Sequence, residues 1–233
     1  NFATWNPTAL AINMGTTLSE GNLKVAEGGS HVGYPHNTFG TIPVTSGKWY
    51  FEIHNVTTAY GSWGICDVDE LTANMTSPLS PLTNPPSDYP QGWGFHNNGN
   101  KENGNTNVSW SSTTVSEDDI KMVAFDMDAG KIWTGTNGTW WESGDPAAGS
   151  GYAYTGQDFG TAVAYVSMND GSAGVVNFGQ DSSFAGGKTA QGNQDSNSIG
   201  DFYYTPPTGF LALCTANLPA VDVVPSEHFN TVL

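Results

Sequence analysis

Alternating apolar and polar residues are clearest at positions 48–54. Trp49, Phe51 and Ile53 fall on one side of this segment, and polar or amphipathic residues stand between them. Since successive side chains of a strand point to opposite faces, the pattern predicts an antiparallel strand with one buried face and one solvated face. Glu52 is expected on the solvated face.

Three more strands are predicted in the middle of the chain, joined by two tight turns. An apolar run at 120–125 ends before Gly130, where glycine tolerates the positive φ of a three-residue hairpin turn. A second run at 131–134 ends at Asn137-Gly138, a pair that favours a type I′ turn. We therefore predict an antiparallel meander here, with its third strand directly after the second turn.

A helix is the alternative for the first of these strands. Residues 116–119, Ser-Glu-Asp-Asp, precede an apolar run and fit the capping box of a helix. Such a helix would have to end within about a dozen residues, at Gly130, and its apolar residues would be contiguous instead of spaced by three and four. The strand is the interpretation we adopt.

Other strands and loops follow from short apolar runs and from the residues that bound them. Runs of this kind predict strands at 23–25, 39–44, 63–68, 92–95, 162–168, 174–178 and 210–214. The turn signal Asn169-Asp170-Gly171 predicts that the strands on either side of it form a hairpin. Long polar loops are predicted at 71–91, 96–107 and 181–201, the first because its five prolines cannot lie inside a sheet.

Length and composition fit a single large β domain. A chain of 233 residues can bury about 70–75% of the surface that it exposes when unfolded. The 29 glycines and 13 prolines are spread along the whole chain and leave few windows for a long helix. The predicted fold class is therefore all-β, with long loops and little or no helix.

Several motifs resemble the SPRY family of domains. They are Ser-Gly-Lys-Trp-Tyr-Phe-Glu-Ile at 46–53, Gly64-Ile65 after it, Phe-Asp-Met-Asp at 125–128 and Val-Val-Asn-Phe-Gly-Gln at 175–180. Their order matches the family, and together they cover residues 23–213. The resemblance implies a bent antiparallel β-sandwich of the concanavalin-like jelly-roll type, which binds partners through its loops and has no catalytic residues.

The resemblance also divides the chain. Residues 1–22 are expected to form an N-terminal extension that packs on the sandwich, residues 23–217 the SPRY-like sandwich, and residues 218–233 an extended exit that leads to further polypeptide. Asn1 is not a start methionine, and the last residues resemble the beginning of a strand. We therefore expect a piece of a longer or processed polypeptide.

Charge restricts the kinds of partner. The chain has 22 acidic residues against 6 lysines and no arginine, so its formal net charge is −16. This charge repels a phosphate backbone, and no bidentate arginine contact to phosphate can form, so nucleic acid and anionic membrane surfaces are excluded as partners. No apolar segment approaches the length of about 18 residues that spans a bilayer, and no signal-peptide pattern is visible, so membrane insertion is not predicted.

The candidate catalytic and metal-binding patterns are incomplete. Glu52 begins a pattern like the β-glucanase motif Glu-x-Asp-x-x-Glu, but His54 replaces its Asp and no second Glu follows. Asp126-x-Asp128-x-Gly130 lacks the third oxygen ligand and the distal Glu of a calcium loop, so hairpin-turn chemistry explains it. We therefore predict no enzymatic activity, no metal and no cofactor.

The two cysteines, Cys66 and Cys214, each stand at the end of an apolar run. Free cysteine is among the most buried residue types, so we predict two buried thiols. A disulfide between them is the alternative, because spacing alone does not show whether their strands are neighbours.

Aromatic residues in or beside predicted turns are the candidate ligand-binding residues. An exposed ring can stack on a sugar or anchor a peptide at modest entropic cost. The residues chosen on this ground are Tyr60, Trp63, Tyr89, Trp110 and Trp141. The alternative is that such rings pack in the core or under loops.

The segments around the SPRY-like motifs resemble SPRY modules in large structural proteins of bacteriophages. These segments are 1–7, 18–23 and 206–219. The resemblance implies an extracellular component of the virion, such as a tail fibre, an appendage or a capsid-surface fibre, assembled as a homo-oligomer such as a trimer. Its partners would be other virion proteins or a protein or glycan of the host surface.

Two other functions stay open. A lectin-like or peptide-binding module of a cell-surface protein would also use exposed loops, and hits on a glycan array would distinguish the lectin. A glycoside hydrolase on a lectin-like sandwich would need two carboxylates that face each other, and hydrolysis that is lost in Glu52→Gln would reveal it.

Overall fold

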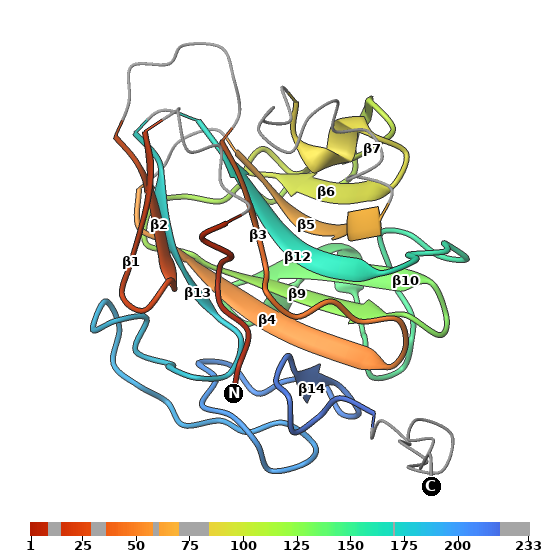
Figure 1. Cartoon of the computed structure of the whole chain (residues 1–233). Coiled ribbons are helices and arrows are strands. Elements are labelled where there is room, and N and C mark those ends of the chain that lie inside the picture. The colour runs from red at the N-terminus through yellow and green to blue at the C-terminus, as the bar shows by residue number, and fades with distance from the viewer. Residues whose placement is uncertain (9–14, 29–35, 58–60, 70–83, 170, 220–233) are drawn as a thin grey trace, which may run out of the picture.

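The computed structural model describes residues 1–8, 15–28, 36–57, 61–69, 84–169 and 171–219, which form two facing sheets (Figure 1). The larger sheet runs, in spatial order, through β1 (Thr16–Ser19), β2 (Lys24–Glu27), β13 (Ala173–Asn177), β4 (Lys48–Asn55), β9 (Ile120–Asp126), β10 (Lys131–Thr136) and β11 (Thr139–Trp140). The smaller sheet runs through β3 (His36–Phe39), β12 (Ala162–Met168), β5 (Gly61–Asp67), β6 (Gly92–His96), β7 (Asn100–Asn103) and β8 (Thr106–Ser109).

Among the described strands, every pair is antiparallel except that of β14 (Leu211–Ala212), which pairs with β4 in parallel. The helical segments among the described residues are short: the 3-10 turns η1 (Pro86–Asp88) and η2 (Trp141–Ser143), and Val68-Asp69 directly after β5. The predicted all-β sandwich with little helix is confirmed.

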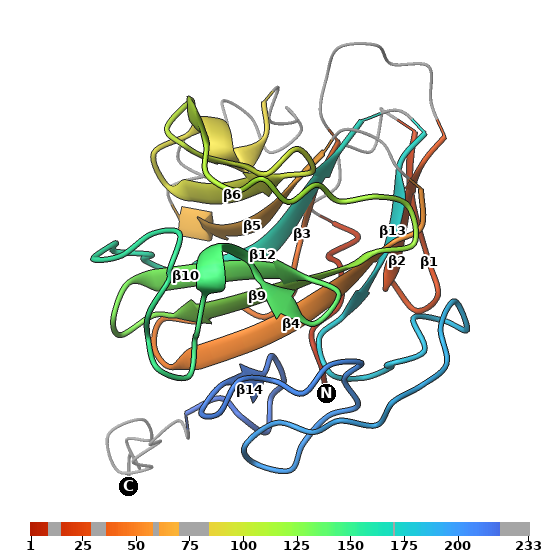
Figure 2. The same ribbon diagram turned by 180° about the vertical axis from the view of Figure 1, so that it is seen from behind.

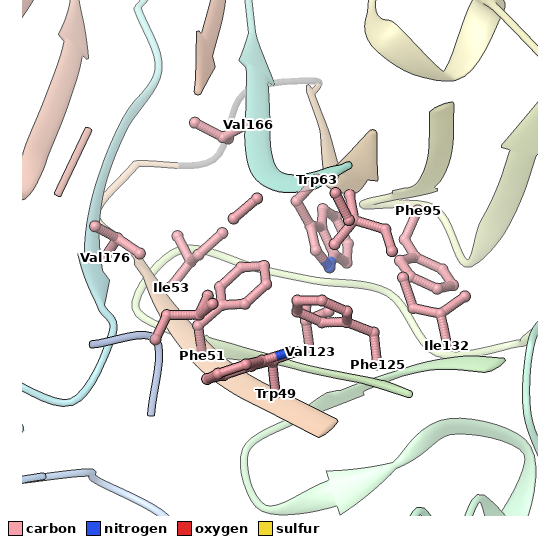
Figure 3. Packing of buried hydrophobic residues seen from close by; sticks show 14 of the residues in the cluster. Trp49, Phe51, Ile53, Trp63, Phe95, Val123, Phe125, Ile132, Val166 and Val176 are labelled. Carbon is pink, nitrogen blue, oxygen red and sulfur yellow. The ribbon is translucent and has the colours of Figure 1, made fainter. Parts of the chain in front are cut away.

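Aromatic and branched side chains from both sheets fill the space between them (Figure 3). Trp49, Phe51 and Ile53 point into this space from β4, as the alternation predicts, and each is at most 1% exposed. Phe51 lies edge-on to Phe125 of β9, with the ring centroids 6.5 Å apart. Trp63 of β5 meets these rings from the smaller sheet and is fully buried.

The predicted meander is confirmed. β9 pairs with β10, and β10 pairs with β11, both antiparallel. Gly130, Asn137 and Gly138 have φ angles of 59°, 51° and 80°, as the two hairpin turns require. The Asp126 carboxylate accepts hydrogen bonds from two backbone N–H groups of the first turn, which is turn chemistry. The helix alternative for this region is wrong, because β9 occupies it.

Two predictions about pairing and loops are wrong. β12 and β13 flank the predicted hairpin turn but do not pair, since β12 lies between β3 and β5 and β13 lies between β2 and β4. The turn signal shows where the chain reverses, but it does not show that the chain crosses to the other sheet. The predicted polar loop at 96–107 contains β7 and the first half of β8. These outlying strands lack the apolar alternation of a half-buried strand, so the pattern misses them.

The alternation at 48–54 predicts that the outer face of the larger sheet, which points away from the smaller sheet, is solvated. This prediction is wrong, because another part of the chain covers that face. Residues 178–214 fold back along it, and Figures 1 and 2 show this covering segment beneath β4. A second hydrophobic cluster forms between the segment and the sheet, and its buried members are Tyr50, Met122, Ala124, Trp133, Phe202, Phe210, Ala212 and Cys214. The covering segment is polar on average, so its sequence looks like that of a solvated loop. Three of its phenylalanines, Phe184, Phe202 and Phe210, are nevertheless buried against the sheet.

Glu52 is buried under this covering segment, with no exposed surface. Its Oε1 accepts hydrogen bonds from the Tyr50 hydroxyl at 2.9 Å and from the Tyr204 backbone N–H at 2.8 Å. Its Oε2 accepts from the Tyr203 backbone N–H at 2.9 Å and from the Asn177 side-chain amide at 3.2 Å. Burial raises the pKa of the Glu52 carboxyl from 4.5 to about 7, although the four donors favour the charged form.

The N-terminal residues also contact the sandwich. The backbone N–H of Ala3 donates to the carbonyl of Leu213 at 2.8 Å, and the buried Trp5 ring lies edge-on to Phe178 at 5.5 Å. β1 falls within the range expected as an N-terminal extension and is an edge strand of the larger sheet. Of the expected C-terminal exit, residues 220–233 lie outside the described residues.

Cys66 and Cys214 are both buried free thiols, as predicted, and the disulfide alternative is wrong. Burial raises the pKa of the Cys66 thiol well above its usual 9, so this thiol stays protonated and unreactive. Among the described residues, no helix is both long enough and apolar enough to cross a membrane.

Candidate functional site

One row of side chains leads from the core to the surface of the smaller sheet. Phe95 of β6 is the partner of Lys101 in β7, and Lys101 is the partner of Val108 in β8. Directly opposed residues share a face, so these side chains all lie on the face that carries the core. Phe95 is fully buried and Lys101 is half-buried, whereas Val108 is 41% exposed. The face of the smaller sheet that is buried in the core at β6 is therefore exposed at β8.

Aromatic rings surround the buried end of this row. Phe95 lies 5.9 Å from Trp110, 6.4 Å from Trp141 and 6.3 Å from Tyr154, measured between ring centroids. Trp141 in turn lies 5.9 Å from Trp63 and 6.2 Å from Trp110. We call these five residues the aromatic cluster, and edge-to-face and tilted contacts of this kind are favourable for aromatic rings.

Hydrogen bonds and two lysines fix the rings in place. Trp63 donates its indole N–H to Thr134 at 3.0 Å, and Trp141 makes the equivalent bond to Thr136. The Lys101 ammonium lies 4.8 Å from the Tyr154 ring centroid and 5.4 Å from that of Trp110. Such cation–π contacts add stability, and they leave the outward side of the cluster rigid.

A second lysine is buried between the sheets. The Lys121 ammonium lies 4.3 Å from the Trp63 ring centroid, and the residue is only 3% exposed. Burial lowers the pKa of the Lys121 ammonium from 10.5 to about 7. Lys121 comes from β9 in the larger sheet, so this contact joins the two sheets beneath the aromatic cluster.

The structure gathers three of the five predicted ligand-binding residues in the aromatic cluster, but two of those three are buried. Trp63 is 0% and Trp141 is 2% exposed, so the expectation of exposed rings is wrong for both, and their indole groups belong to the core. Trp110 is half-buried and reaches the surface. Tyr89 is half-buried elsewhere, beside Cys66 on the other face of the smaller sheet, and Tyr60 lies outside the described residues.

The far side of β8 is a free strand edge. All four of its residues are exposed, and among the described strands only β7 pairs with it. In an antiparallel pair, every second residue directs its backbone N–H and C=O groups toward the neighbouring strand. The two-residue turn at 104–105 fixes which residues these are, so Thr106 and Val108 bond to β7. The N–H and C=O groups of Asn107 and Ser109 therefore point away from the sheet. Gly104-Asn105 is itself a hairpin signal, so the sequence held a clue to this strand.

The arrangement suits binding better than bond breaking. It offers one exposed branched side chain, one half-buried indole and the outward backbone groups of an edge strand. Both carboxylate oxygens of Glu52, the candidate glycosidase acid, are already bound by donors of the chain itself. No group of three or more His, Cys, Asp or Glu residues in the described part of the chain could hold a metal ion.

Comparisons with known proteins identify the fold. No family model matches the sequence, and no curated protein matches it either. The structure matches 222 chains of solved structures, among them the SPRY domain of human HERC1 with a TM-score of 0.54 and 16% sequence identity. That match covers 74% of this chain and 96% of the HERC1 domain chain. The chain therefore has the β-sandwich fold of a SPRY domain, as its motifs predicted.

Proposed function

We propose that this chain is a non-catalytic binding module that recognises an extended segment of a protein partner at the free edge of β8. The observation that carries this proposal is the edge itself, where every residue is exposed and Val108 is 41% exposed. Natural proteins usually shield such an edge with charged residues, proline or a covering loop, because it pairs readily with other strands. The sequence of β8, Thr-Asn-Val-Ser, has neither a charge nor a proline.

An added strand would gain two kinds of contact. The outward backbone groups of Asn107 and Ser109 would continue the hydrogen-bond ladder of the smaller sheet. Side chains on the core-facing side of the added strand would meet Val108 and the half-buried Trp110. Because Lys101 and the rest of the aromatic cluster already hold Trp110, little conformational entropy is lost when a partner binds.

The charge of the chain favours a basic partner segment. A formal net charge of −16 attracts lysine- and arginine-rich segments over long distances and repels acidic ones. We therefore infer a partner segment that combines β-branched residues with Lys or Arg. The rate of association should fall as salt is added, since salt screens this attraction.

Selection of displayed peptides on the folded domain tests the proposal. The selected peptides are then compared on Asn107→Pro, which removes an outward N–H, and on Asn107→Ala, which keeps it. Both variants lose the side-chain hydrogen bond from Asn100 equally. The proline variant should bind about tenfold more weakly than the alanine variant, because a backbone bond is lost and the ring obstructs the approaching strand. Equal affinity for the two variants would contradict recognition at this edge.

We further propose that the module belongs to a virion, as a tail fibre, an appendage or a capsid-surface component, and that its partner is another virion protein or a host surface molecule. Support comes from the phage-like segments 1–7, 18–23 and 206–219 in the sequence. Antibodies against the domain should label intact particles in electron micrographs of cultures that produce the chain. Label confined to the particle-free fraction would contradict this location.

The same resemblance supports a homo-oligomer such as a trimer. Light scattering on the purified chain should then give a multiple of its 24.6 kDa mass. A mass that stays at one chain over the accessible concentration range would contradict the proposal for the isolated chain.

A further inference from the structure

The β7–β8 hairpin carries two charged residues, and they lie on opposite sides of the smaller sheet. Lys101 and Glu102 are consecutive in β7, so their side chains point to opposite sides. Lys101 is the partner of Val108 and lies on the core side, which faces the larger sheet. Glu102 is the partner of Asn107 and lies on the outer side. A strand added beyond β8 would therefore have a cation near one of its sides and an anion near the other.

The core side of the hairpin is apolar at its edge and positive behind it. Val108 is 41% exposed, and the half-buried Trp110 follows it on the same side. The Lys101 ammonium donates to the Ala153 carbonyl at 2.5 Å and lies against the ring of Tyr154. None of the ion pairs among the described residues includes Lys101. No acidic group neutralises its charge, so a second cation on this side would be repelled.

The outer side of the hairpin is polar and negative. The side-chain amide of Asn100 donates to the Asn107 side chain at 2.6 Å, and these two amides lie on this side of the hairpin. The Glu102 carboxylate accepts a hydrogen bond from the Ser87 hydroxyl at 3.0 Å and lies 2.8 Å from Nε2 of His96. A basic side chain of a partner is attracted to this side by Glu102 and by the net charge of −16.

The side on which an added residue lies is tied to the direction of its backbone N–H. All pairs within the smaller sheet are antiparallel, and an antiparallel addition continues this pattern. A residue opposite Asn107 or Ser109 then bonds to β8 through its own N–H and C=O groups, and its side chain lies on the outer side. A residue opposite Val108 directs its N–H away from β8, and its side chain lies on the core side.

We propose that the partner segment is an antiparallel strand whose two sides differ, an inference that rests on the proposed function at β8. Its residues opposite Asn107 and Ser109 are Lys or Arg, and its residue opposite Val108 is apolar and packs on Val108 and Trp110. Lys101 is a specificity-determining residue, because its charge disfavours Lys or Arg on the core side. The partner strand therefore alternates basic and apolar residues in a fixed orientation on the edge.

Two alternating Lys–Val octapeptides of identical composition test this inference, because N-methylation fixes which side faces the core. An N-methylated residue has no N–H to donate, and its methyl group blocks the strand edge to which it points. In the first peptide every Val is N-methylated, so only the Lys residues can bond to β8 and the Val side chains lie on the core side. In the second peptide every Lys is N-methylated, which places the Lys side chains on the core side.

Fluorescence anisotropy of the labelled peptides measures the two affinities. The first peptide should bind about tenfold more tightly, because its Val side chains are buried against Val108 and Trp110. Equal affinities, or tighter binding of the second peptide, would overturn the inference and leave recognition at the β8 edge standing. Binding of neither peptide would overturn both the inference and the proposed recognition at this edge.

A lysine variant tests the role of Lys101. Lys101→Met keeps a long side chain beside Trp110 but removes the charge, so the ratio of the two affinities should fall to about threefold. Lys131→Met is the matched control, since Lys131 is also half-buried, donates to the Gly149 carbonyl at 2.9 Å and lies 4.9 Å from the Tyr152 ring centroid. The control should leave the ratio unchanged. A ratio that stays at about tenfold in Lys101→Met, or falls equally in both variants, would overturn this role.

Discussion

Replacing Glu52 with Gln tests how the covering segment is held on the larger sheet. In the wild type both carboxyl oxygens accept hydrogen bonds, from Tyr50 and Tyr204 on one side and from Tyr203 and Asn177 on the other. A glutamine keeps one acceptor oxygen, but its NH₂ group only donates. The Tyr50 hydroxyl can reverse and accept from this group, whereas the Tyr204 backbone N–H cannot. One buried N–H is left without an acceptor, at a cost of about 2 kcal/mol.

The dependence on pH is the second part of this prediction. Burial raises the pKa of the Glu52 carboxyl in the folded state from 4.5 to about 7, so folding favours the protonated form. The stabilising contribution of Glu52 is therefore complete below pH 4.5 and is lost as the pH rises through about 7. The loss is roughly 3 kcal/mol, at about 1.36 kcal/mol per pKa unit. Glutamine does not titrate, so the advantage of the wild type over Glu52→Gln should vanish or reverse above pH 7.

Urea unfolding of both proteins, followed by tryptophan fluorescence at about pH 4.5 and about pH 8, measures the two effects together. The difference between wild type and variant at each pH cancels the titration of other groups, such as Lys121. Glu142→Gln, an exposed acid, is the matched control and should change stability little at either pH. A wild-type advantage that is the same at both pH values, or larger at the higher one, would refute the reasoning.

Three further predictions concern the core and the aromatic cluster. Lys121→Met should raise the free energy of unfolding at pH 7 by roughly 2–3 kcal/mol in urea titrations, because the cost of burying an ammonium exceeds the stabilisation by the lost cation–π contact. An unchanged midpoint of urea unfolding would contradict this. Gly130→Ala should lower the free energy of unfolding by about 3 kcal/mol in the same assay, since φ is 59° and the new Cβ would come within 2.1 Å of the Gln157 carbonyl oxygen. A decrease below about 0.5 kcal/mol would contradict this prediction. Trp63→Phe should lower the melting temperature but leave the affinity for selected peptides unchanged, whereas Trp110→Ala should weaken that affinity; the opposite ranking would place recognition elsewhere.

Local turn chemistry and alternation were enough to predict the centre of the fold. Gly130 and Asn137-Gly138 adopt the positive φ that their turns require, and the strands around them pair in the expected order. Trp49 and Ile53 point into the core because the alternation at 48–54 has a period of two. These features depend on residues close together in the sequence, which is why a pattern can show them.

The opposite side of the same strand could not be predicted, because it depends on a distant segment. The alternation shows that Glu52 and His54 share a face, but not that residues 178–214 cover this face. A stretch rich in Gly, Ser, Asn and Gln looks like a solvated loop. Its few aromatic residues, such as Phe202, are too widely spaced to give a strand or helix period, although Phe202 is fully buried.

The candidate site was predicted in part for a related reason. Trp63, Trp110 and Trp141 were selected as turn aromatics, and the structure brings all three together. Whether a ring is exposed depends on which strands cover it, and sequence position does not show this for Trp63 or Trp141. The exposed edge at Val108 was hidden because an edge strand with polar residues resembles a loop.

Hydrogen–deuterium exchange of the backbone amides of β8, with and without a selected peptide, tests the central claim most directly. The outward amides of Asn107 and Ser109 should exchange quickly in the free domain and become protected when the peptide binds, because they then join a continued strand ladder. Amides at the β1 edge, such as that of Thr17, should be unaffected. Protection that appears elsewhere while the β8 amides continue to exchange quickly would contradict recognition at this edge.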